Sequence, residues 1–161
     1  MPSTREAAIG LCLTLTPKLE GGPFLTAIAD PVRGWSTPTI GYGHTGPEVH
    51  QGSTITLDTA DYLLRSDLNT AANELEKCVP SAQLDTILDN HERTALVDFC
   101  FNLGANPSWQ IWKLLRAGNV NAAGVPIADR QLAASVRVGS QPAAFQLRRE
   151  GQTQADGRLA R

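Results

Sequence analysis

Two carboxylates flank a glycine-containing turn region in the first third of this 161-residue chain. Glu20 lies where a predicted helix ends, and Asp30 lies in a predicted turn before a short strand that carries Thr39. Hydrolysis of a glycosidic bond needs two such groups, one protonated to donate to the leaving oxygen and one ionised to activate water or act as nucleophile. A solvated glutamate and a turn aspartate give the same pattern, so the residues alone leave both interpretations open.

The order of motifs around these residues is more specific than the pair itself. Glu20-Gly21 and Asp30-Pro31 precede the run Thr39-Ile40-Gly41-Tyr42-Gly43-His44-Thr45-Gly46. Two further blocks follow in order, at residues 63–68 and 95–104. Together they closely resemble the phage-type lysozymes, the T-even and lambdoid endolysins of glycoside hydrolase family 24, over roughly residues 15–117.

The resemblance implies a muramidase that cuts the β-1,4 bond between N-acetylmuramic acid and N-acetylglucosamine in bacterial peptidoglycan. It implies Glu20 as general acid with a pKa raised by partial burial, Asp30 as base or electrostatic partner, and Thr39 as the residue that positions water. Nine residues separate Glu20 from Asp30 and eight separate Asp30 from Thr39, against the family's usual eight and five. We expect residues 21–23 and 32–38 to absorb the difference.

A histidine and an aspartate have a structural interpretation near this site. In the resembling family the histidine of the run pairs with an acid on the following helix, and Asp67 occupies that position for His44. We expect this ion pair in preference to a catalytic histidine. No compact metal-ligand spacing is found among His44, His50 and His91, and the cysteines at 12, 78 and 100 form no Cys-x-x-Cys pair. Neither a metal nor another cofactor is therefore expected.

Three residues are candidates for substrate contact. Trp35 lies in a loop beside Asp30 and can stack on a sugar ring, as can Tyr42. Asn102 is a third candidate, although an asparagine at a helix end also caps backbone groups. Trp109 and Trp112, three residues apart on one helix face, are interpreted as core.

The periodicity predicts a mainly α (α+β), lysozyme-like fold. We expect a helix over 4–16 that Pro17 ends or kinks, turns and short strands over 21–52 where seven glycines and four prolines occur, and a helix from Leu57 to Cys78 capped by Thr56. Asn90 is expected to cap a buried central helix that ends at Gly104. Ser108 is expected to cap a helix over 109–117, with weaker helices over 128–137 and 142–150.

These elements predict a single domain over 1–161. Its small antiparallel β lobe covers about 18–55, its helical lobe covers about 1–17 and 56–151, and residues 152–161 form a frayed tail.

Charge and hydropathy exclude some classes of protein. The formal charge of −2 argues against a generic nucleic-acid-binding protein, although it divides into −7 over residues 1–98 and +5 over residues 99–161. The early apolar run over 7–13 is far shorter than the roughly 20 residues that cross a bilayer, and Glu6 beside Arg5 is unlike a signal peptide. We therefore expect neither an anchor nor a stable membrane insertion.

An endolysin with these properties would accumulate as a monomer in the host cytoplasm and would need a holin-type lesion to reach the periplasm or cell wall. Its partner would be peptidoglycan. Three alternatives stay open: a non-catalytic peptidoglycan-binding or virion structural module, a lytic transglycosylase that needs only the glutamate, and an antimicrobial effector that disrupts membranes through its basic C-terminal third.

Overall fold

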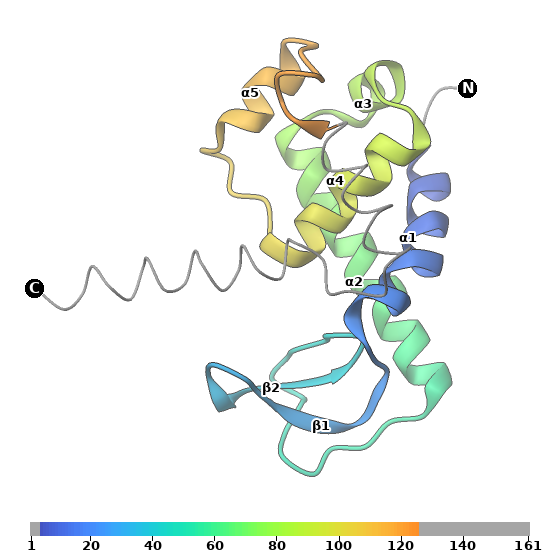
Figure 1. The fold of residues 1–161 in the computed structure, drawn as a ribbon, viewed down its shortest axis with the longest axis vertical. Coiled ribbons are helices and arrows are strands. Elements are labelled where there is room, and N and C mark those ends of the chain that lie inside the picture. The colour runs from blue at the N-terminus through green and yellow to red at the C-terminus, as the bar shows by residue number, and fades with distance from the viewer. Residues whose placement is uncertain (1–3, 126–161) are drawn as a thin grey trace, which may run out of the picture.

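The computed structural model describes residues 4–125 of the chain. In chain order the elements are α1 (Arg5–Glu20), β1 (Phe24–Asp30), β2 (Gly34–Gly41), α2 (Leu57–Cys78), α3 (Ser81–Ile87), α4 (Asn90–Leu103) and α5 (Gln110–Arg116). Figure 1 shows the β1–β2 hairpin on one side and α3, α4 and α5 on the other, with α1 and α2 connecting the two lobes. The predicted mainly helical fold with a small antiparallel sheet is confirmed. The helices expected over 128–137 and 142–150, and the tail over 152–161, lie outside the described residues.

The first helix is longer than the sequence predicted. The Thr4 side chain accepts a hydrogen bond from the Ala7 amide at 3.1 Å, and α1 then continues through Pro17 to Glu20. Pro17 was expected to end or kink the helix, and the first of these alternatives was wrong. Proline removes one backbone donor, but burial of residues on either side of it, Thr16 and Leu19, holds the last turn against the helical lobe. Gly21, with a φ of 69°, ends the helix in the left-handed conformation, so Glu20 lies on an ordered last turn.

The hairpin contains two irregularities in its register. Ile28 pairs with Thr39, and Asp30 pairs with Gly34. Over these pairs β1 advances two residues while β2 advances five, so β2 carries three additional residues. This bulge lies within residues 32–38, where the sequence predicted that the longer spacing between Asp30 and Thr39 would be absorbed.

The second helix joins the two lobes and was predicted closely. Thr56 caps it by accepting a hydrogen bond from the Thr59 amide at 3.2 Å, and its buried residues recur at three- or four-residue intervals as far as Cys78. Its N-terminal end lies beside the hairpin and its C-terminal end lies in the helical lobe (Figure 1).

The central helix α4 packs against both α1 and α2. Its cap is Asp89 and not Asn90, because the Asp89 carboxylate accepts from the Glu92 amide at 2.8 Å while Glu92 accepts from the Asp89 amide at 3.0 Å. The predicted N-cap, Asn90, was therefore wrong by one residue. Its end at Gly104 is confirmed.

A buried arginine connects four helices. Arg93 of α4 is 1% exposed and donates to Glu76 of α2 and to Ser81 of α3, each at 2.9 Å, and also to Asp85 of α3. Glu76 also accepts from Arg5 of α1 at 2.8 Å. The carboxylate and hydroxyl partners of the buried guanidinium offset the free-energy cost of removing its charge from water.

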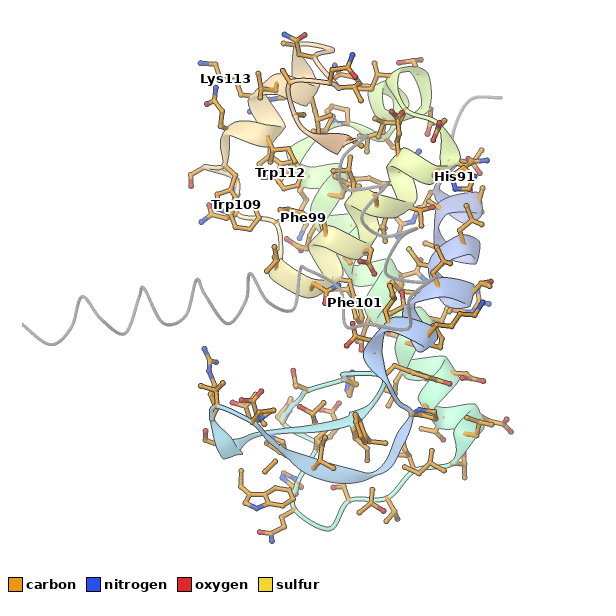
Figure 2. The ribbon with its side chains drawn as sticks, in the orientation of Figure 1. His91, Phe99, Phe101, Trp109, Trp112 and Lys113 are labelled. Atoms are coloured by element: carbon orange, nitrogen blue, oxygen red, sulfur yellow. The ribbon has the colours of Figure 1, made fainter. Side chains whose placement is uncertain are left out.

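The aromatic residues of the helical lobe form a cluster. Figure 2 shows Phe99, Trp109 and Trp112 together where α4 faces α5, with ring centroids 5.6–6.3 Å apart. Trp112 is fully buried and Trp109 packs against the same core, which confirms their interpretation as core residues. Ser108 does not cap α5, because its amide and hydroxyl both bind Asn106 Oδ1.

Within residues 4–125, none of the helices combines the length and hydropathy needed to span a membrane.

Candidate active-site cleft

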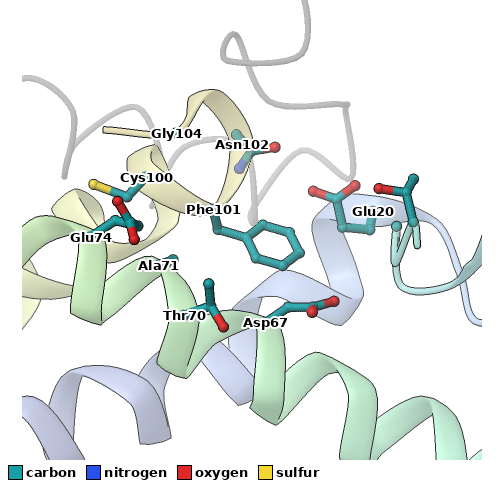
Figure 3. Close-up of a pocket in the computed structure, with 11 residues that line it drawn as sticks. Glu20, Asp67, Thr70, Ala71, Glu74, Cys100, Phe101, Asn102 and Gly104 are labelled. Carbon is teal, nitrogen blue, oxygen red and sulfur yellow. The ribbon is translucent and has the colours of Figure 1, made fainter. Parts of the chain in front are cut away.

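A cleft of about 290 Å³ lies where the C-terminal end of α1, the loop after β2, α2 and the end of α4 approach one another. Carboxylates, hydroxyls, an amide and an aromatic ring share its wall. The lining residues are Glu20, Gly43, Thr45, Asp67, Thr70, Ala71, Glu74, Cys100, Phe101, Asn102 and Gly104. Figure 3 shows Glu20 at one side of this cleft, with Phe101 between it and the α2 residues Thr70 and Ala71. The cleft therefore combines a carboxyl group at its edge with polar groups and an apolar surface, as ligand-binding pockets commonly do.

Glu20 lies between the end of α1 and the loop that follows β2. It is the last residue of α1 and is partly buried. On its other side, a Cβ atom built on Gly43 would lie 3.7 Å from Glu20 Oε2. Gly43 has a φ of 101°, which side-chain-bearing residues rarely adopt, so glycine allows the backbone after β2 to approach the carboxylate.

His44 forms the contact that the resemblance implied. Its Nδ1 atom lies 2.8 Å from Asp67 Oδ2, and its Nε2 atom lies 2.7 Å from Glu48 Oε1. Partial burial by itself lowers the pKa of His44, but the two carboxylate hydrogen bonds outweigh it and the net pKa is raised. The hydrogen bond from His44 lowers the pKa of Glu48. Through these two hydrogen bonds the imidazole fixes the loop after β2 to α2, directly beside the cleft.

Asp30 and Thr39 lie in the hairpin and are not among the residues that line the cleft. Oδ1 of Asp30 accepts hydrogen bonds from the amides of Val32 and Arg33 at 2.8 and 2.7 Å, so this oxygen stabilises the turn at the hairpin tip. Thr39 is partly buried opposite Ile28. Of the three predicted catalytic residues, the cleft contains Glu20.

The candidates for substrate contact are separated in the same way. Asn102 lines the cleft and is 5% exposed. Trp35 is 45% exposed on β2, outside the cleft. Tyr42 is 8% exposed in the core, and its pKa is raised by burial and by the adjacent Asp61 carboxylate. Of these three residues, Asn102 lies in the cleft, whereas Tyr42 packs in the core.

Sequence reasoning did not single out several cleft residues, namely Thr45, Thr70, Glu74 and Phe101. Phe101 and Asn102 are consecutive near the end of α4, and a polar residue after an apolar run at a helix end was a usable signal for a site. Glu74 lies on the polar side of α2 and binds Lys77 at 2.5 Å, so its sequence pattern is that of a solvated helix surface.

A sequence model described as phage lysozyme matches residues 18–150, which is most of the chain. The chain belongs to the phage lysozyme family. A curated relative, the endolysin of Bacillus phage B103, is 36% identical over 87 residues, covering 53% of this chain. The match spans 31% of that relative's length, about a third.

Solved lysozyme structures share the fold. The muramidase domain of SpmX from Asticaccaulis excentricus has a TM-score of 0.58 at 28% identity, covering 75% of this chain and 77% of that one. A single-site mutant of P22 lysozyme has a TM-score of 0.55 at 25% identity, with 83% and 97% covered. An endolysin from Escherichia coli O157:H7 phage FAHEc1 has a TM-score of 0.53 at 22% identity, with 84% and 92% covered, which supports the fold alone.

Proposed function

We propose that this member of the phage lysozyme family hydrolyses the β-1,4 bond between N-acetylmuramic acid and N-acetylglucosamine in bacterial peptidoglycan. The observation that carries the proposal is the position of Glu20 on the last turn of α1, at the edge of the cleft between the two lobes. Membership of the family and the similarity to a curated endolysin support the same substrate class.

In this proposal Glu20 is the general acid. It donates its proton to the glycosidic oxygen as the bond to the leaving sugar breaks, and charge develops on the other sugar. Phe101 and the backbone at Gly43 lie beside this carboxyl group in the cleft. Glu20→Gln retains the shape of the side chain and removes the transferable proton.

Asp30 and Thr39 are proposed as the base and the water-positioning residue. Oδ1 of Asp30 is occupied by the two turn amides, which leaves Oδ2 as the oxygen that would act on water or on the sugar. Trp35, exposed on the same hairpin, is proposed to stack on a sugar of a longer glycan strand.

A second candidate is a lytic transglycosylase. It needs one glutamate and no activated water, because the sugar's own hydroxyl attacks and an anhydromuramic product forms. The cleft lining favours this possibility, since Glu20 is the member of the predicted catalytic set that lies in it. A non-catalytic peptidoglycan-binding module is the third possibility, and the same experiment separates all three.

The test is product analysis of purified peptidoglycan treated with the wild-type chain, Glu20→Gln and Asp30→Asn. If the chain is a hydrolase, the wild type should release new reducing ends from peptidoglycan, and Glu20→Gln should release none although it binds peptidoglycan equally well. Anhydromuramic products would show that the chain is a lytic transglycosylase and not a hydrolase. Wall binding with no released product would contradict both enzymatic functions. A circular dichroism spectrum of Glu20→Gln that matches the wild type controls for folding.

A further inference from the structure

The described part of the molecule contains a buried carboxylate that the proposed reaction does not use. Asp98 of α4 is 6% exposed and faces α1, where the Thr16 hydroxyl donates to its Oδ1 at 3.4 Å. Within residues 4–125 it forms no ion pair. Burial, and secondarily the nearby Asp98 carboxylate, raise the pKa of the Cys12 thiol of α1. Burial raises the pKa of Asp98 to about 6. A buried carboxylate with no cation beside it destabilises the fold when it is ionised.

Asp98 holds the side-chain amide of Asn102. Nδ2 of Asn102 donates to the backbone oxygen of Asp98 at 3.0 Å and to its Oδ2 at 3.4 Å. An amide nitrogen has two hydrogens, and Asp98 supplies an acceptor for each. The nitrogen end of the Asn102 amide is therefore turned inward.

The oxygen end of the same amide faces the cleft. Figure 3 shows the Asn102 oxygen directed toward the side on which Glu20 lies, with the nitrogen turned away from it. Among the described residues, none donates a hydrogen bond to this oxygen. The cleft thus presents a fixed, largely buried acceptor whose orientation depends on a residue outside the cleft.

We propose that Asp98 is a positioning residue, which holds the Asn102 amide so that its oxygen accepts a hydrogen bond from an acetamido N–H of the glycan. This inference rests on the proposed function, because it takes an N-acetylated sugar as the ligand. An acetamido group offers one donor and one methyl group close together. Asn102 matches the donor, and the ring of Phe101 next to it in the cleft supplies an apolar surface for the methyl group.

The experiment measures binding apart from turnover. In a Glu20→Gln background, calorimetry determines the Kd for a soluble peptidoglycan tetrasaccharide and for the same tetrasaccharide after N-deacetylation. We expect Asn102→Ala to raise the Kd for the acetylated form by about 3- to 10-fold, the loss expected of one neutral hydrogen bond. Asp98→Leu removes the Oδ2 acceptor but keeps the backbone oxygen, so we expect the amide to be held less firmly and the Kd to rise by about 3-fold, the lower end of that range. Asp98→Asn retains an acceptor for the Asn102 amide, and we expect its Kd within about twofold of the parent.

Two comparisons distinguish positioning from a structural effect. In the Asn102→Ala background, Asp98→Leu should have no further effect on Kd, because the group it positions is absent. Thr94→Val is the matched control, since Thr94 is a buried α4 residue one turn earlier whose hydroxyl donates to the carbonyl oxygens of Asn90 and Ala8 and to neither Asp98 nor Asn102. We expect its Kd to be unchanged, with stability measured separately by thermal unfolding.

Additive losses in the double variant would overturn the positioning role, as would an equal loss in Thr94→Val or an equal effect on the deacetylated ligand. Acetylated ligand that binds unchanged to Asp98→Leu would overturn this inference and leave the proposed function standing. Failure of the Glu20→Gln chain itself to bind the acetylated tetrasaccharide would overturn both.

Discussion

His44 Nδ1 lies 2.8 Å from Asp67 Oδ2, and this contact joins the loop after the hairpin to the helix that runs into the other lobe. Glu48 binds the opposite ring nitrogen at 2.7 Å. The two carboxylates therefore hold one imidazole at the rim of the cleft, between the elements that carry Gly43 and Asp67.

This arrangement predicts a pH-dependent contribution to stability. Because the pKa of His44 is raised in the folded state, its contribution to the free energy of unfolding is complete below its unfolded-state pKa near 6.5. This contribution is lost as the pH rises through its folded-state pKa. The lowered pKa of Glu48 gives a contribution present above its unfolded value near 4.5. We expect His44→Asn to lower Tm most between about pH 4.5 and 6.5, by about 2–4 °C once solvent screening is allowed for. His91→Asn, at an exposed position, is the control. An equal loss at pH 9 would show that the contribution is not ionic.

Two substitutions of Asp30 separate the effect of its negative charge from its role in the turn. Asp30→Asn keeps an oxygen for the Val32 and Arg33 amides but removes the negative charge, whereas Asp30→Ala also removes the turn acceptor. If Asp30 is the second catalytic carboxylate, we expect Asp30→Asn to lower kcat by about 10²- to 10⁴-fold with an unchanged Tm. Turbidity loss of permeabilised cells and thermal unfolding provide the two measurements. Near-normal activity in Asp30→Asn, with a loss in Asp30→Ala, would assign the residue to the turn alone.

Arg93 is expected to be the most sensitive charged residue of the helical lobe. Arg93→Met removes the partner of Glu76 and Asp85 from a site that is 1% exposed, so we expect a loss of about 3 kcal/mol in the free energy of unfolding. That corresponds to a Tm lower by about 6–12 °C. Arg65→Met, on the exposed face of α2, is the matched control and should change stability by less than about 0.5 kcal/mol. An equal response in the two variants would contradict a structural role for the buried cluster.

The sequence predicted the elements whose signals are local. Thr56 and the spacing of the leucines and alanines after it predicted α2 to its last residue, because a side-chain cap and an amphipathic period act within one helix. Helix α3 was not foreseen: it is seven residues long, and its first position follows Pro80, which provides no side-chain cap. Pro17 misled the prediction of α1, because packing of the last turn against α4 is not visible in the local pattern.

Contacts between distant segments explain the rest. Arg93 and Asp98 lie within one apolar helix, where the sequence does not reveal that the first meets Glu76 and Asp85 and the second meets Thr16. Glu20 lines the cleft, and the His44–Asp67 contact that the resemblance implied is present, because the motifs that carry these residues are local. It did not reveal the bulge geometry that keeps Asp30 at the hairpin tip, since register depends on pairing across the sheet.

Asp98 leads to the last prediction, which concerns stability and not binding. Its unfolded pKa is near 3.8 and burial raises the folded value to about 6, so the folded state holds this proton over a range in which the unfolded state has released it. Stability from this group is therefore greatest at low pH and decreases as the pH rises between these values. The full difference corresponds to about 3 kcal/mol, as an upper limit.

Asp98→Asn removes that titration while retaining an acceptor for the Asn102 amide. In urea unfolding we expect the variant to be more stable than the wild type by about 1–3 kcal/mol at pH 8, with the difference vanishing at pH 4, where the buried wild-type carboxyl group is neutral. Asp58→Asn, exposed in the first turn of α2, should show no such pH-dependent difference. A variant destabilised equally at both pH values would mean that the hydrogen bonds of Asp98, and not its charge, determine what its burial contributes to stability.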